Sequence, residues 1–183
     1  MKSTGYVLCE KPSVGIEPTR LTDKSRFENH GTYTSITDVQ LTSGSWVASY
    51  DGIASKITVG DLAQNIQTFM CWIYADAISR AIVDFDSGTH SVEIDATPDV
   101  TATGWATPTI YVNGSSASAT VAISTWYHIA VTTATPFDAN AVVLGDEATF
   151  WDGYLSLSKI LNYALSADQI YTIYQKERGY FGV

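Results

Sequence analysis

Turn signals recur roughly every ten residues along much of this chain, a spacing typical of β-sandwiches. Asp51-Gly52, Gly60-Asp61 and Asn113-Gly114 are examples, and Asn-Gly and Asp-Gly are strong turn formers because they tolerate positive φ. The segments between the turns are rich in Thr, Val, Ile, Tyr and Trp, which favour strands. Strands do not alternate with helices, so a parallel sheet is not expected. The pattern predicts an all-β, antiparallel two-sheet sandwich.

The expected strands are short and differ in polarity. Residues 68–74 are nearly all apolar, which predicts a strand buried on both faces. Residues 90–95 alternate instead, with Val92 and Ile94 on one face. The full set of expected strands is 45–50, 55–59, 68–74, 80–85, 90–95, 109–112, 118–123, 126–132, 141–144 and 153–160.

One helix is expected near the C-terminus. Ser166 followed by Gln169 three positions later fits a capping box, in which each side chain satisfies a backbone N–H of the first turn. Ile170, Ile173 and Tyr174 then fall on one face. We therefore expect a short amphipathic helix packed against the sandwich.

Length and composition restrict the classes of function. A chain of 183 residues accommodates one ordinary domain, and we expect an N-terminal arm over 1–19 and the domain over 20–183. The formal net charge of −9 argues against nucleic acid as a partner, because phosphate binding needs a basic face. No segment approaches the roughly 20 apolar residues of a membrane span. The N-terminus lacks the apolar core of a secretory signal, so no signal peptide is predicted.

The two cysteines, Cys9 and Cys71, are too few for a disulfide scaffold. Cys71 lies in an apolar run, which predicts a buried thiol, and a bridge to Cys9 stays open.

Five segments carry recognisable motifs: 21–32, 50–59, 68–74, 126–132, and 152–157 together with 162–170. These motifs resemble those of the laminin G-like, concanavalin A-like jelly-roll domains. The order and spacing agree over about 155 residues, roughly 20 to 176. The closing motif is the most specific.

The resemblance implies a jelly-roll sandwich with one C-terminal helix. Such domains are mostly binding or adhesion modules for carbohydrate or protein; some bind calcium at a rim, and some are appendages on virion surfaces. In this chain the Tyr111-Val112-Asn113-Gly114 segment precedes Trp126, whereas family members often place it afterwards. Similar variants occur among phage and other virion proteins. Fold alone does not choose among these functions.

A catalytic site is not expected. Related laminarinase-type enzymes carry E-x-D-x-x-E on one strand, and Glu93-Ile94-Asp95 matches the first half. The third acid is missing, and Pro98 would interrupt the strand. His30, His90 and His128 lack metal-ligand spacing, and His128 is interpreted as a satisfied structural residue.

Calcium is the one cofactor left open. Asp84 and Asp86 supply two carboxylates in a tight turn, and oxygen-rich loops suit this hard cation. The alternative is that Asp beside Gly is turn chemistry.

Aromatic residues are the remaining candidates for ligand binding. Trp46, Trp72 and Trp126 lie in expected strands and are assigned to the core. Trp105 and Trp151 lie in expected loops, where exposed aromatics suit sugar stacking or a protein interface. The alternative is that both side chains pack inward and anchor their loops. The candidate ligand-binding residues are therefore Trp105, Trp151 and Tyr154.

These observations favour a non-enzymatic structural or interaction module. The first hypothesis is a virion-associated surface protein, such as a phage head decoration or tail protein, anchored to other subunits of the particle by residues 1–19. Its location would then be the virion surface, and a homo-oligomer stays open. The alternative is a lectin-like adhesion module that binds cell-surface glycan.

Overall fold

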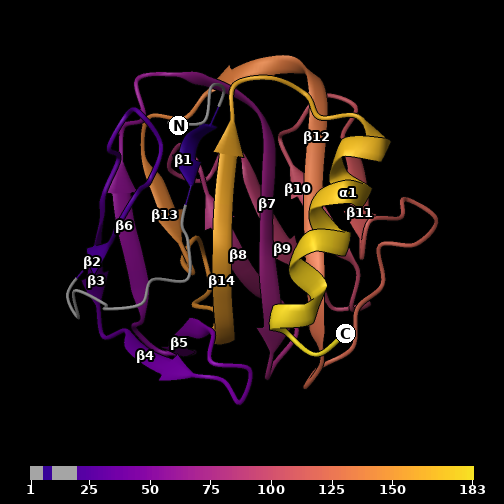
Figure 1. Ribbon diagram of the computed structural model, residues 1–183. Coiled ribbons are helices and arrows are strands. Elements are labelled where there is room, and N and C mark those ends of the chain that lie inside the picture. The colour runs from indigo at the N-terminus through magenta and orange to yellow at the C-terminus, as the bar shows by residue number, and fades with distance from the viewer. Residues whose placement is uncertain (1–5, 10–19) are drawn as a thin grey trace.

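The computed structural model describes residues 6–9 and 20–183, which form a jelly-roll sandwich of two antiparallel sheets with one C-terminal helix (Figure 1). This confirms the predicted fold class. We call the first sheet the helix-covered sheet; its strand order is β11-β12-β7-β14-β5-β4, with β1 also paired to β14. The strands of this sheet are β1 (Tyr6–Cys9), β4 (Thr37–Gln40), β5 (Trp46–Asp51), β7 (Asn65–Ala75), β11 (Thr109–Val112), β12 (Trp126–Asp138) and β14 (Asp152–Leu161).

The second sheet has the order β10-β9-β8-β13-β6-β3-β2. Within the described residues, the paired strands of both sheets run antiparallel, as expected from the frequent short turns. Its strands are β2 (Arg20–Leu21), β3 (Gly31–Thr34), β6 (Lys56–Gly60), β8 (Arg80–Asp84), β9 (Ser91–Ile94), β10 (Val100–Thr103) and β13 (Val142–Leu144).

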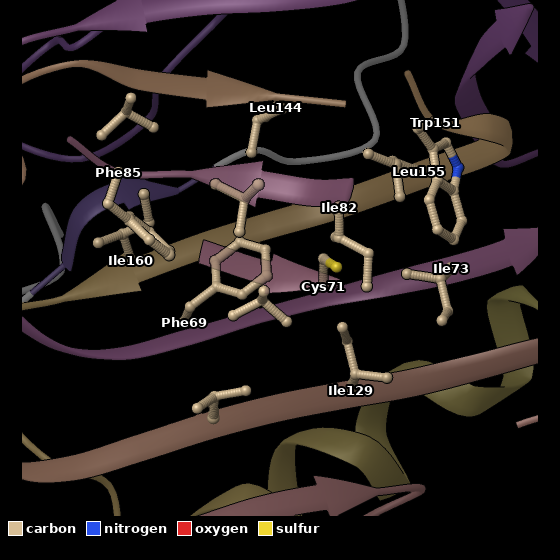
Figure 2. Close-up of a cluster of buried hydrophobic side chains, with 14 of the residues drawn as sticks. Phe69, Cys71, Ile73, Ile82, Phe85, Ile129, Leu144, Trp151, Leu155 and Ile160 are labelled. Carbon is tan, nitrogen blue, oxygen red and sulfur yellow. The ribbon is translucent and has the colours of Figure 1, made fainter. Parts of the chain in front are cut away.

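The hydrophobic core lies between the sheets (Figure 2). Phe69 and Ile73 of β7 face Ile82 and Leu144 of the second sheet, and all four are buried. Cys71 is also buried, as predicted, whereas the Cys9 side chain lies outside the described residues. Strand β7 is buried on its other face too, because Met70 and Trp72 point toward the helix. The apolar run at 68–74 is explained by these two layers.

Helix α1 (Ala167–Glu177) lies over β11 and β12 and beside β7 on the outside of the helix-covered sheet, and continues into the short 3-10 helix η1 (Arg178–Tyr180) (Figure 1). Both halves of the predicted capping box are present: Ser166 accepts from the Gln169 N–H, and the Gln169 side chain accepts from the Ser166 N–H. Ile170 and Tyr174 are buried against the sheet. The predicted helix and its start are therefore confirmed.

Part of the strand pattern predicted from the sequence is wrong. Residues 118–123 form no strand, and their ladder contact is the isolated bridge of Thr120 to Asp99. Strands β3, β4 and β10 were not anticipated.

Within the predicted arm, Tyr6–Cys9 form β1 and pair with β14, so this piece is part of the sandwich. The rest of the arm, 1–5 and 10–19, lies outside the described residues. In the part of the chain that is described, no helix is long and apolar enough to cross a membrane.

Candidate functional site

A row of side chains crosses five adjacent strands on the outer face of the helix-covered sheet. Trp126 of β12 is the register partner of Tyr74 in β7, and Tyr74 is also opposite Tyr154 of β14. Tyr154 is opposite Ser49 of β5, which is opposite Thr37 of β4. We call these five residues the aromatic row. Three aromatic groups therefore lie beside two hydroxyls on one rigid surface.

The three rings of the row contact one another. The centroids of Tyr74 and Trp126 lie 5.5 Å apart, and those of Tyr74 and Tyr154 also lie 5.5 Å apart. Trp126 and Tyr154 lean together over Tyr74, with centroids 6.2 Å apart and planes inclined by 30°. All three are half-buried, so each ring still presents an edge or part of a face to solvent. Mutual packing holds these rings in place before any ligand arrives.

The row is partly open because α1 and the residues that follow it, which we call the C-terminal cover, end beside it. Phe181 stacks on Trp72, which lies two residues before Tyr74 in β7 and is fully buried; the two ring centroids are 4.3 Å apart. Phe181 then meets only one end of the aromatic row, at Trp126, with centroids 4.7 Å apart. Four members of the row are half-buried, and Thr37 at the far end is exposed.

A cleft of about 500 Å³ adjoins the row at Trp126. It lies between the β4–β5 turn and residues 179–182. The Ser43 hydroxyl donates to the Tyr180 carbonyl at 2.6 Å and holds the two walls together. Gln40 adds a polar group to the lining. A mostly apolar lining that contains aromatic side chains and a few polar groups can stack a ring and orient its hydroxyls.

Three carboxylates lie in the next row along the same sheet. Asp152 is opposite Asp51, and the Asp76 N–H donates to the Asp152 carbonyl at 2.9 Å. Burial and the neighbouring Asp152 charge raise the pKa of Asp76. The N–H groups of Ala54 and Ile53 hold the pKa of Asp51 below its usual range. We call Asp51, Asp76 and Asp152 the acidic row.

The expectation that Trp105 and Trp151 are exposed is wrong. Trp105 is only 5% exposed and packs edge-on against Phe85 and Phe137. Trp151 is fully buried and lies beside Leu155 in the core (Figure 2). Both indoles point inward because burying an aromatic side chain of this size between the sheets is more favourable in free energy than exposing it to water. Of the three predicted ligand-binding residues, Tyr154 belongs to the aromatic row.

The other two aromatic members of the row were missed, as were Ser49 and Thr37. Trp126 was assigned to the core but is half-buried on the outer face, and Tyr74 was not singled out. The available signal was alternation: Trp72 and Tyr74 point to one face of β7, and this face is covered by α1 only in part.

Asp84 and Asp86 organise their own turn. Asp84 accepts from the N–H groups of Asp86 and Gly88, at 3.1 and 2.9 Å. Asp86 accepts from the His90 N–H at 2.7 Å and contacts the His90 ring. Over residues 6–9 and 20–183, no group of three or more His, Cys, Asp or Glu side chains is arranged to hold a metal ion. These contacts match the turn-chemistry alternative, and calcium binding here stays a prediction.

A buried polar layer lies between α1 and the sheet. Lys159 pairs with Glu177 at 2.8 Å, and the Trp72 indole N–H donates to the same carboxylate at 3.0 Å. His128 is fully buried beside them, and burial together with the Lys159 charge lowers its pKa to about 3. Neither ring nitrogen of His128 has a hydrogen-bond partner among the described residues, so it is structural but not satisfied as predicted.

Several solved structures share this fold. Domain 4 of AbnA, a GH43 extracellular arabinanase from Geobacillus stearothermophilus, in complex with arabinotriose, has a TM-score of 0.55 at 15% sequence identity and covers 78% of this chain and 82% of that chain. A structure of botulinum neurotoxin type C, whose cell entry is described as dependent upon interaction with two ganglioside molecules, has a TM-score of 0.54 at 9% identity, over 94% of this chain and 51% of that chain.

The botulinum neurotoxin serotype D binding domain gives a TM-score of 0.53 at 13% identity, over 94% of this chain and 52% of that chain. This chain thus spans about half the length of the toxin chains. No known protein family matches the sequence, and no curated protein is significantly similar to it. The similar structures confirm the jelly-roll fold.

Proposed function

We propose that this protein is a non-enzymatic carbohydrate-binding module whose aromatic row is the binding surface. The observation that carries the proposal is the packed, half-exposed group of Tyr74, Trp126 and Tyr154 on one rigid sheet. Aromatic faces complement the C–H faces of sugars, and pre-positioned rings spare the ligand the cost of ordering them. Ser49 and Thr37 extend the row with hydroxyls that pair with sugar hydroxyls.

The similar structures support this hypothesis better than the virion hypothesis. One was determined with arabinotriose and another concerns ganglioside interaction, and neither description mentions a virion. The virion prediction rests on the missing signal peptide, the N-terminal arm over 1–19 and the variant order of the Tyr111–Gly114 segment. Most of the arm lies outside the described residues. The virion hypothesis remains a separate prediction.

A non-enzymatic role fits the residues that first suggested catalysis. Asp95 accepts from the Thr97 hydroxyl and from the Thr97 and Asp99 N–H groups, so its carboxylate is committed to a turn. These hydrogen bonds hold the pKa of Asp95 below its usual value. A glycosidase needs a second carboxyl poised as an acid, which this turn does not supply.

The test is a glycan-array screen, with and without calcium, followed by titration calorimetry on any glycan that binds. Truncation of a central aromatic anchor costs about 2 kcal/mol, so Tyr154→Ala and Trp126→Ala should each weaken binding roughly 30-fold. Tyr171→Ala is the control, because Tyr171 is 53% exposed on α1, away from the row.

Thermal melts separate binding from folding, since Trp126 also contacts Phe181. Tyr154→Ala should lose binding with a melting temperature close to that of Tyr171→Ala. Unchanged affinity in both row variants, or a blank array, would refute the proposed function.

A further inference from the structure

The acidic row lies directly beside the aromatic row on the same face. Asp152 and Asp51 stand two positions along a strand from Tyr154 and Ser49. Asp76 stands two positions after Tyr74, just past the end of β7, where the Asp152 charge acts on it. Residues two apart in a strand point to the same face and lie roughly 7 Å apart. That distance is close to the width of one sugar ring. A glycan seated on the aromatic row therefore meets these carboxylates with its edge.

Neither row contains a lysine or an arginine. Three cations are engaged elsewhere: Lys56 pairs with Asp146 at 2.9 Å, Lys159 pairs with Glu177 at 2.8 Å, and the Arg178 side chain donates to the Val183 carbonyl at 2.6 Å. The charged side chains within the two rows are all carboxylates.

These carboxylates differ in how much of their hydrogen-bonding capacity is free for a ligand. One oxygen of Asp51 accepts three backbone N–H bonds, from Ile53, Ala54 and Ser55. Asp76 is exposed, and Asp152 is half-buried between the strands that carry the other two. A carboxylate has several acceptor sites and no proton to donate when it is ionised. It pairs well with hydroxyl donors and poorly with another anion.

We infer that the Asp51–Asp76–Asp152 row makes this site selective for neutral, hydroxyl-rich glycans over sialylated, uronic or sulfated ones. The inference rests on the proposed function and adds the charge class of the ligand. Sugar hydroxyls donate charge-assisted hydrogen bonds to the carboxylates. An anionic sugar in the same place brings like charges together, and such repulsion is a common source of specificity.

The test uses glycan pairs that differ by one acidic sugar, with lactose against sialyllactose as the reference pair and arabinotriose as a further neutral probe. Neutral members should bind roughly ten-fold or more tightly than their anionic partners at low salt. The difference should shrink at high salt, because screening weakens repulsion between exposed charges. The protein used is the full chain.

The double variant Asp76→Asn/Asp152→Asn should bring the two members of a pair to within about three-fold of each other. Asp61→Asn is the matched control, since it removes one charge in the turn at the opposite end of β7. The control should keep the parental discrimination.

The outcomes separate the two proposals. Anionic glycans that bind as tightly as their neutral partners, with binding still lost in Tyr154→Ala, would overturn the charge selection and keep the proposed function. Discrimination that survives the double variant would also overturn it. Absence of binding to every member of every pair would overturn both.

Discussion

Acidification should destabilise this protein through a single buried imidazole. His128 is 0% exposed and lies between Trp72 and Tyr174, with ring centroids 5.4 and 6.1 Å away. Burial, and then the charge of Lys159, lowers its pKa from 6.5 to about 3. The layer also contains Glu177, which pairs with Lys159. The side-chain amide oxygen of Asn113 accepts a hydrogen bond from the backbone N–H of His128, not from its ring. The native state therefore holds His128 neutral.

The sign and size of the effect follow from proton linkage. Below pH 6.5 the unfolded chain binds a proton at His128, whereas the native state does not bind this proton until pH falls to about 3. The contribution of neutral His128 to the free energy of unfolding is therefore fully present above pH 6.5 and is lost as pH falls from 6.5 to about 3. One pKa unit corresponds to about 1.4 kcal/mol, so the decline is roughly 2 kcal/mol between pH 7 and pH 5, and roughly 5 kcal/mol over the whole window.

The assay is urea denaturation of the parent and His128→Gln at pH 7 and pH 5. Glutamine does not titrate, so the variant should lose roughly 2 kcal/mol less than the parent between these pH values. His30→Gln, which removes a histidine outside this layer, should keep the parental decline. Equal declines in the parent and His128→Gln would refute the reasoning, whatever the absolute stability of the variant. His128→Phe serves as a second non-titrating variant if the glutamine variant does not fold.

Three further predictions concern stability. Ser166→Ala removes the N-cap and should cost about 1 kcal/mol in urea denaturation; an unchanged midpoint would contradict the capping box. Lys159→Met leaves Glu177 as an unpaired carboxylate beneath α1 and should cost about 3 kcal/mol, whereas Lys159→Met/Glu177→Gln should recover part of that loss, as a double-mutant cycle would measure. Trp151→Ala opens a core cavity and should cost about 3–5 kcal/mol, while calorimetry on the folded fraction should show unchanged glycan affinity; weaker affinity would return Trp151 to the site.

Elements specified by neighbouring residues were predictable. The Asp51-Gly52 turn depends on contacts within a few residues, and Asp51 does accept N–H bonds from the residues that follow it. The start of α1 depends on Ser166 and Gln169 alone. The all-β class and the doubly buried β7 follow from composition and periodicity. Each of these features is encoded locally, so no knowledge of distant contacts is required.

Elements that require a partner were less predictable. Residues 118–123 have strand-like composition, yet β11 pairs with β12 along its length and leaves them only isolated backbone bonds, such as Val121 N–H to the Pro98 carbonyl. β4 contains Asp38 and Gln40 and has only modest strand propensity, yet it pairs with β5, and β3 pairs with β6. A strand forms where an unpaired edge is available, and the edge is made by residues far away in the sequence.

The sequence by itself determined the sandwich, its turns, its capped helix and the supply of aromatic and acidic residues. Only the tertiary structure decided which of these side chains face water. Trp105 and Trp151 were candidates for exposure because they lie in loops, but both side chains are buried in the core. Trp126 looked buried because it begins a strand, but the C-terminal cover stops at its edge. Exposure depends on what covers a residue, and here α1, which comes from far along the chain, covers part of the outer face of β7.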